Sequence, residues 1–144
     1  MDLLERARAL AACPLFAALA PAVVIRLAER AQPSELAPGE RRTTDDTVWI
    51  VAAGSLAIAA RGAAAFDASA SAMKRQGGIA TAGHAIGLVR VVAPGTPVVD
   101  AIAMRPTTVL SIEHDDMRDV LEEDPAALAA LADALARALL GGPA

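Results

Sequence analysis

The connection between residues 77 and 95 is rich in glycine, and it is the segment whose residue types could bind a ligand. Gly83 and Gly87 enclose His84 within it. Glycine adopts backbone conformations that other residues avoid, so this density of glycine indicates a loop of specific shape. A histidine in such a loop can contact an anion, although an exposed loop residue is the simpler interpretation of His84.

The sequence gives little support for a metal site or for a catalytic residue. His114 precedes Asp115 and Asp116, and all three residue types can ligate a metal. Consecutive residues at a helix start point in different directions, however, and an acidic first turn is favourable by itself because of the helix dipole. The sequence has neither the Gly-Lys-Ser/Thr ending of a triphosphate-binding loop nor a Gly-x-Ser-x-Gly motif. We predict no metal site, no catalytic residue and no enzyme.

The composition predicts one small domain, spanning residues 1–144, in the cytoplasm. Of the 144 residues 55% are hydrophobic but only 2% are aromatic, so the core consists mainly of small aliphatic side chains. The 13 basic residues are scattered among 17 acidic ones, which disfavours direct nucleic-acid binding. No uncharged run reaches the roughly 18 apolar residues of a membrane helix, and Met1–Leu10 does not resemble a signal peptide. The lone Cys13, predicted to be buried, fits a reducing compartment.

Two helices are expected at the N-terminus. Residues 2–12 are amphipathic, and their predicted inward stripe is Leu3, Leu4, Ala7, Leu10 and Ala11. Pro14 interrupts this helix, and Pro21 suits the first position of a second helix that runs to Ala31. Its predicted inward residues are Val24, Leu27 and Ala28.

Short strands follow. The alternating stretches 48–53 and 56–60 predict a hairpin with a turn at Gly54. Residues 98–103 and 107–112 predict a second pair around Pro106. Between these pairs, we expect an exposed loop over 62–71 and a weak strand over 73–79.

Two helices are expected at the C-terminal end. The first begins at His114, with Met117, Val120 and Leu121 inward, and the second begins at Asp124 and Pro125. The second helix carries an apolar ridge that either forms a homodimer seam or packs against its own domain. The ridge residues are Leu128, Leu131, Leu135 and Leu139.

Three stretches in this order resemble the cyclic-nucleotide-binding domain family, the β-roll sensors of catabolite-activator-type regulators, kinase regulatory subunits and gated channels. Cys13–Phe16 is similar to the family's short N-terminal helix, Ala37–Glu40 to its Gly-Glu turn, and Val48–Gly54 to the stretch that leads into its central hairpin. The family loop before that stretch is shortened to Thr44–Asp46. The resemblance implies an α+β, mainly β fold: a double-stranded β-helix (β-roll) over 32–112, flanked by helices in 1–31 and 113–141.

The resemblance also implies a ligand pocket between Gly83 and Val98. In the family, a glycine-rich loop and a short helix present N–H groups to the cyclic phosphate, a glutamate binds the ribose and an arginine pairs with the phosphate. Gly83, Ile86 and Gly87 match the loop.

Both charged anchors of that pocket are missing. Leu88 stands at the glutamate position, and the arginine position falls at Thr96 or Pro97. Arg90 is the only basic residue inside the loop, and a surface role is its simpler interpretation. Losing one partner of a buried charged pair commonly costs about 2 to 5 kcal/mol, so tight cyclic-nucleotide binding is not expected.

The sequence therefore predicts a regulatory or protein-interaction module of this type, without a cofactor. Two alternatives remain open: a sensor of another ligand through Gly87 with Arg90 or His84, and an oligomerisation module. The expected partners are a second copy of the chain, another protein, or further domains of a longer chain.

Overall fold

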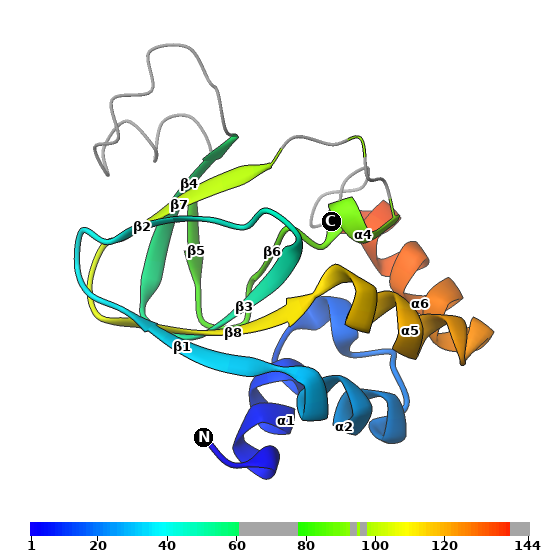
Figure 1. Cartoon of the computed structure of the whole chain (residues 1–144). Helices are drawn as coiled ribbons and strands as arrows, with labels where there is room; N and C mark the ends of the chain where they lie inside the picture. Colours follow the sequence, from blue (N-terminus) through cyan, green and yellow to red (C-terminus); the bar gives the residue numbers. More distant parts are fainter. Residues whose placement is uncertain (61–77, 93–94, 96–97, 139–144) are drawn as a thin grey trace.

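A computed structural model describes residues 1–60, 78–92, 95 and 98–138 of the chain. Eight short strands form two antiparallel sheets, the helices from the two ends of the chain pack together on one side of them, and the whole is a β-roll with flanking helices, as predicted (Figure 1). No helix in the described ranges has the length and apolar character needed to cross a bilayer.

The N-terminal helices are close to their predicted positions. They are α1 (Leu3–Ala11), the 3-10 turn η1 (Pro14–Phe16) and α2 (Pro21–Arg30). In α1 only Ala7 and Leu10 of the predicted stripe are buried; Leu3, Leu4 and Ala11 are exposed, because the helix touches the rest of the chain along a narrow line. In α2 the predicted inward residues are buried, and Val23 joins them.

The eight strands form two four-stranded sheets. The first has the order β1 (Gln32–Leu36), β8 (Thr107–Glu113), β3 (Thr47–Ala53) and β6 (Ala85–Ile86). The second has the order β2 (Arg41–Thr43), β7 (Val99–Ala103), β4 (Ser55–Ala60) and β5 (Ile79–Thr81).

The predicted hairpin at Gly54 and the predicted strand pair around Pro106 are both wrong. β3 and β4 follow each other along the chain but lie in different sheets, and so do β7 and β8. Alternation of apolar residues tells which face of a strand is buried, and it does not tell which strand lies beside it. The chain changes sheet at Gly54 and again between Ala103 and Thr107.

These two corners contact each other. The Ser55 N–H donates to Thr107 Oγ1 at 3.2 Å, and the single proton of that hydroxyl has two acceptors in reach, the Arg105 carbonyl at 2.8 Å and the Ser55 carbonyl at 3.1 Å. The Met104 N–H reaches the same carbonyl at 3.0 Å. Gly54 has a φ of +96°, and a Cβ placed there would lie 2.5 Å from Thr107 Oγ1. Only glycine fits this corner.

Four strands were not predicted or only partly so. β1 contains Pro33, which lacks an N–H and weakens a strand pattern; it is accepted because β1 lies at a sheet edge. β2 and β6 are too short to show a period. Of the predicted strand 73–79, Ile79 lies in β5 and Gly78 comes directly before it, whereas residues 73–77 lie outside the described residues, as does the predicted loop 62–71.

The first sheet is buried on both faces. Val48 and Ile50 of β3 point to the helices, and Trp49 and Val51 point to the second sheet. We call the apolar group between the two sheets the roll interior. It consists of Leu36, Trp49, Val51, Leu56, Ala80, Ile86, Ala101, Ala103 and Val109.

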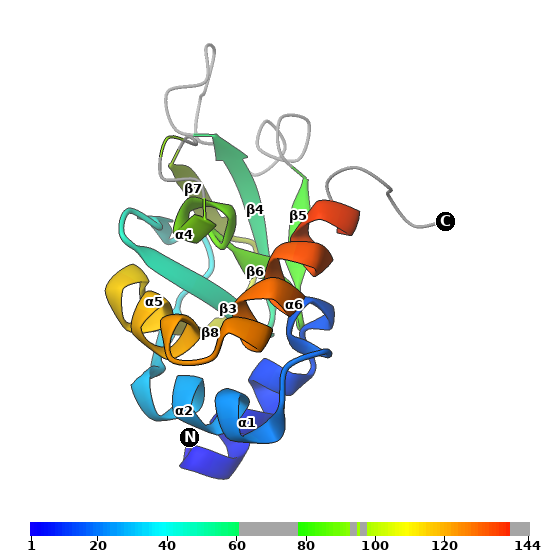
Figure 2. The same ribbon diagram turned by 90° about the vertical axis from the view of Figure 1, so that its right-hand side faces the viewer.

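Helices α5 (His114–Glu122) and α6 (Pro125–Ala136) complete the helical side (Figure 2). Met117, Val120 and Leu121 are buried as predicted. Asp124 caps α6, since its Oδ1 accepts from the N–H groups of Ala126 and Ala127. We call the apolar group between the helices and the first sheet the helix-side core.

Replacing Gly54 by alanine should destabilise the protein far more than replacing Gly39. Both glycines have positive φ, so both substitutions carry the left-handed backbone cost of about 1–2 kcal/mol. A Cβ at Gly39 meets nothing within 4 Å, whereas one at Gly54 meets both side chain and backbone. The clash should add roughly 1–3 kcal/mol. Urea unfolding of Gly54→Ala and Gly39→Ala measures the difference, and equal losses would contradict the role given to this corner.

Candidate functional site

The predicted glycine loop is shaped by contacts to neighbouring elements. Gly83 and Gly87 have φ values of +91° and +83°. The Gly83 N–H donates to the Val51 carbonyl at 2.9 Å, and a Cβ at Gly87 would lie 3.0 Å from the Thr47 carbonyl. The loop therefore needs glycine both for conformation and for close approach to β3 and the turn before it.

The side chain and the backbone of His84 both accept hydrogen bonds that hold this loop. Its Nδ1 accepts from the Thr81 N–H at 2.8 Å, and its carbonyl accepts from the Val51 N–H at 3.0 Å. The side chain is exposed. These contacts give His84 a structural task in the turn, and its contact with an anion stays a prediction.

The residues that follow the loop lie in different surroundings. Ile86 lies in the roll interior, whereas Leu88 is 2% exposed in the helix-side core. Arg90 lies on the one-turn helix α4 (Val89–Val92) and is half-buried. Val98 is half-buried before β7. Thr96 and Pro97 lie outside the described residues.

A charged pocket opens beside this predicted segment. Its volume is about 480 Å³. It is bounded by α4, the start of α5, the end of β8 and the turn before β3, and its lining residues are Asp46, Thr47, Arg90, Glu113, His114, Asp115 and Arg118. Among the predicted ligand residues only Arg90 lines it. We call this group the charged pocket.

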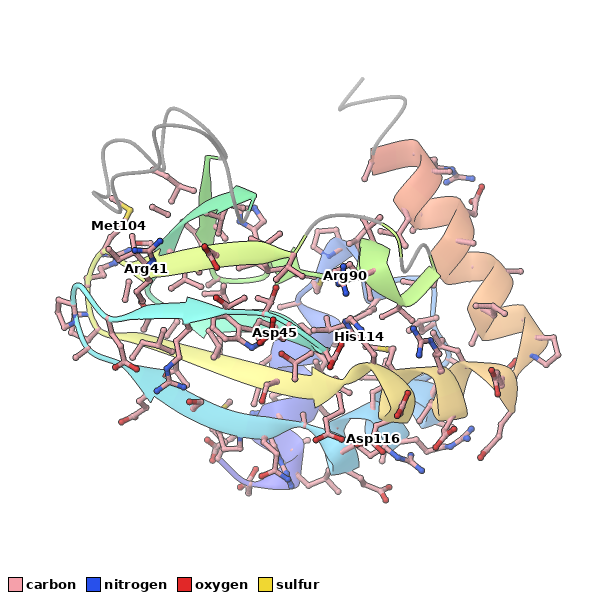
Figure 3. All side chains as sticks on the ribbon, turned by 45° about the horizontal axis from the view of Figure 1, so that its top comes forward. Arg41, Asp45, Arg90, Met104, His114 and Asp116 are labelled. Atoms are coloured by element: carbon pink, nitrogen blue, oxygen red, sulfur yellow. The ribbon has the colours of Figure 1, made fainter. Side chains whose placement is uncertain are left out.

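His114 is the most buried residue of the charged pocket, at 5% exposure. Its N–H donates to the Asp46 carbonyl at 2.9 Å, while its ring Nε2 is buried without a hydrogen-bond partner among the described residues. Figure 3 shows it at the start of α5, below Arg90 of α4.

Burial is the main cause that lowers the pKa of His114 below its ordinary value of 6.5. The nearby charges of Arg118 and Arg90 lower this pKa further. The carboxylate of Asp46 and a hydrogen bond to the Thr47 backbone act in the opposite direction with smaller effect. The imidazole is therefore neutral at neutral pH.

The two acids after His114 bind different partners. Asp115 Oδ1 lies 3.3 Å from a guanidinium nitrogen of Arg118, whose Nε donates to the Val91 carbonyl at 3.5 Å. Asp116 pairs with Arg30 of α2 at 3.6 Å. Sequence reasoning did not include Asp46, Glu113 or Arg118 in a site. Glu113 and Arg118 are close in sequence to His114, but no local signal joins this segment to Asp46 or to Arg90.

The predicted α6 ridge divides into buried and exposed positions. Leu131 and Leu135 belong to the helix-side core, with exposures of 0% and 6%. Leu128 is 39% exposed, and Leu139 lies outside the described residues. The ridge thus packs largely against its own domain. A homodimer seam on this helix stays a prediction, and Leu128 is the ridge residue that is free to test it.

The whole chain was compared with known proteins. No protein-family model and no curated protein sequence matches it. Among solved structures it is similar to the N-terminal domain of a transcriptional regulator from Streptomyces coelicolor A3(2), with a TM-score of 0.64 and 24% sequence identity. The match covers 96% of this chain and 90% of that one. This likeness establishes a shared fold.

Truncating Leu131 should cost much more stability than truncating Leu128. Leu131→Ala leaves a cavity in the helix-side core and should lower the free energy of unfolding by about 2–5 kcal/mol. Leu128→Ala, one turn away and partly exposed, should cost about 1 kcal/mol or less. Urea unfolding of the two variants decides the point. Similar losses of unfolding free energy in the two variants would mean that α6 packs against the domain through a different face.

Stability should fall as pH decreases through 6.5, partly through His114. Since burial lowers its pKa in the folded state, the unfolded chain binds the proton more readily, and stability is lost below the ordinary histidine value. Urea unfolding between pH 7.5 and 5 should show a shallower fall for His114→Gln than for the wild type. An unchanged slope in His114→Gln would contradict the assignment.

Proposed function

We propose that the chain is a regulatory or protein-interaction module of the cyclic-nucleotide-binding type that does not bind cyclic AMP or cyclic GMP tightly. The apolar roll interior carries this proposal. Its nine members are all hydrophobic residues, and seven of them are alanine, valine or leucine residues that pack in one cluster with Trp49 and Ile86.

A cyclic nucleotide brings a negative phosphate and a polar ribose. Burying a phosphate charge without a cation or several N–H donors is costly. The one buried acidic residue in the described part of the chain is Asp100, and it is already held by the Thr43 hydroxyl and by Arg41 at 3.8 Å. A carboxylate repels a phosphate in any case. The roll interior thus supports an apolar packing role.

The position of Leu88 adds to this argument. The family's ribose-binding glutamate falls at this residue in the sequence comparison, yet Leu88 packs toward the helices. Neither Thr96 nor Pro97 has a charged side chain that could replace the arginine. Neither of the two charged residues that would hold the nucleotide is present, and Leu88, at the glutamate position, packs in the helix-side core.

A regulatory role is supported by the shared fold. The similar solved structure is a domain of a transcriptional regulator. We propose that this chain likewise acts through contacts to a second copy, to another protein or to further domains, with exposed Leu128 on α6 as one contact. The single cysteine, Cys13, is buried, and its burial raises the pKa of the thiol, which suits a reducing cytoplasm. Nothing in this role requires enzyme activity.

Cyclic nucleotides should leave the melting temperature unchanged. A ligand at 100 times its dissociation constant adds about 2.7 kcal/mol of stability, so 1 mM cyclic AMP would produce a clear shift if the dissociation constant were about 10 μM. Thermal unfolding with cyclic AMP and cyclic GMP is compared with 5′-AMP, which has the same groups but no cyclic phosphate. A saturable shift specific to a cyclic nucleotide would overturn the proposal.

A further inference from the structure

Helix α1 keeps apolar side chains on its outer surface. Leu4 is 56% exposed, and Leu3 is exposed as well, although the sequence places both on the apolar stripe of the helix. Ile25 of α2 is also exposed. The two helices lie side by side at the end of the molecule away from β4 (Figures 1 and 2). Exposed apolar side chains gathered on one part of a surface are typical of an interaction site.

An apolar groove lies between these two helices. It has a volume of about 300 Å³, and its wall includes Ala11 of α1, Phe16 of η1 and Ile25 of α2. Among the described residues that line it, Arg8 alone carries a charge. Leu4 lies one turn before Arg8 on the same side of α1, because residues four apart are neighbours on a helix. The groove can therefore receive an apolar side chain beside a positive charge.

The charged side chains of Glu5 and Arg8 have no partner within the described part of the chain. The N-cap bond at Glu5 uses its backbone N–H, which donates to Asp2 Oδ1 at 2.8 Å and leaves the Glu5 carboxylate unused. Glu5 and Arg8 are both exposed, and they are neighbours on the outer side of α1 because they are three residues apart. This face of the helix thus presents a negative charge, a positive charge and Leu4.

The face is complementary to itself in an antiparallel pair of α1 helices. With a two-fold axis near the middle of the helix, Glu5 of one copy faces Arg8 of the second copy, and the reverse contact forms by symmetry. Leu4 then reaches the stretch from Arg8 to Ala11 in the second copy, and both of these residues line the groove. One register therefore pairs the charges and buries the leucine, and it does so twice.

We propose that α1 and the groove beside it form a two-fold interface with a second copy of this chain, in which Leu4 enters the partner's groove and Glu5 pairs with the partner's Arg8. Closed two-fold dimers are the commonest assemblies of soluble chains, and they require a patch that fits itself. The inference rests on the proposed interaction role and names its partner. It does not involve the roll interior or the ridge of α6.

A lipid surface fits this face less well than a second copy does. Helices that lie on membranes carry mainly lysine and arginine on their polar side, and they are attracted to anionic head groups. Helix α1 has Asp2 as its N-cap and Glu5 in its first turn, so acidic groups would approach those head groups. A patch with charges of both signs is instead matched by a partner with the same two charges in the opposite order.

Sedimentation equilibrium of the whole chain, between about 10 μM and 1 mM, tests the interface. An interface built on one short helix is below the standard size, so we expect weak association. The wild type should change from monomer towards dimer within this range. A monomer at every concentration would overturn this inference, whereas the proposed function would fail separately, through a melting shift with a cyclic nucleotide.

Two leucine variants locate the interface. Leu4→Gln should weaken dimerisation about tenfold or more and leave the melting temperature close to that of the wild type, because this leucine is exposed in the single chain. The matched control is Leu128→Gln, which removes the exposed leucine of α6 and should dimerise like the wild type. If only Leu128→Gln lost the dimer, the seam would lie on α6 and this inference would be wrong.

Charge reversal tests the register. Glu5→Arg and Arg8→Glu should each weaken dimerisation by at least about fivefold, because two exposed ion pairs are replaced by two like-charge contacts. The double variant should recover dimerisation, since opposite charges face each other again. Any loss of folding stability in a single variant is carried into the double variant, so recovery reports the contact between copies. Single variants that dimerise normally, or a double variant without recovery, would overturn the pairing of Glu5 with Arg8.

Discussion

Thr107 and Ser55 join the two corners at which the chain leaves one sheet for the other. The hydroxyl of Thr107 accepts from the Ser55 N–H, and the Ser55 carbonyl accepts from the Met104 N–H, so both backbone groups are satisfied where strand pairing stops. The absence of a side chain at Gly54 allows this approach. Strands β3 and β4 can then belong to opposite sheets, and so can β7 and β8. A roll, rather than a set of hairpins, follows from this contact.

The roll separates apolar from charged surroundings. Its first sheet is covered by helices on one face and by the second sheet on the other, so both faces of β3 carry apolar side chains. Charged side chains that could bind a ligand lie instead at the ends of the strands. The charged pocket lies at such a place, where β8 passes directly into α5 and the turn before β3 lies beside it. His114 is buried there because it begins the helix that closes the helix-side core.

The apolar filling of the roll is the physical basis of the proposed role. The regulatory role without cyclic nucleotides rests on a roll interior filled with hydrocarbon, which offers a phosphate no partner.

Local patterns in the sequence were sufficient for the helices at the two ends of the chain and for the longer strands β3, β4, β7 and β8. Helical periodicity places Val24, Leu27 and Met117 inward, and Asp124 with Pro125 starts α6, because these effects act within one or two turns of a helix. The resemblance to a known family added the roll. Only the tertiary structure decided the strand partners, the exposure of Leu128 against the burial of Leu131, and the meeting of Asp46, Arg90 and His114. These depend on which distant segments become neighbours, and a period along the chain records the face of an element but not what lies against it.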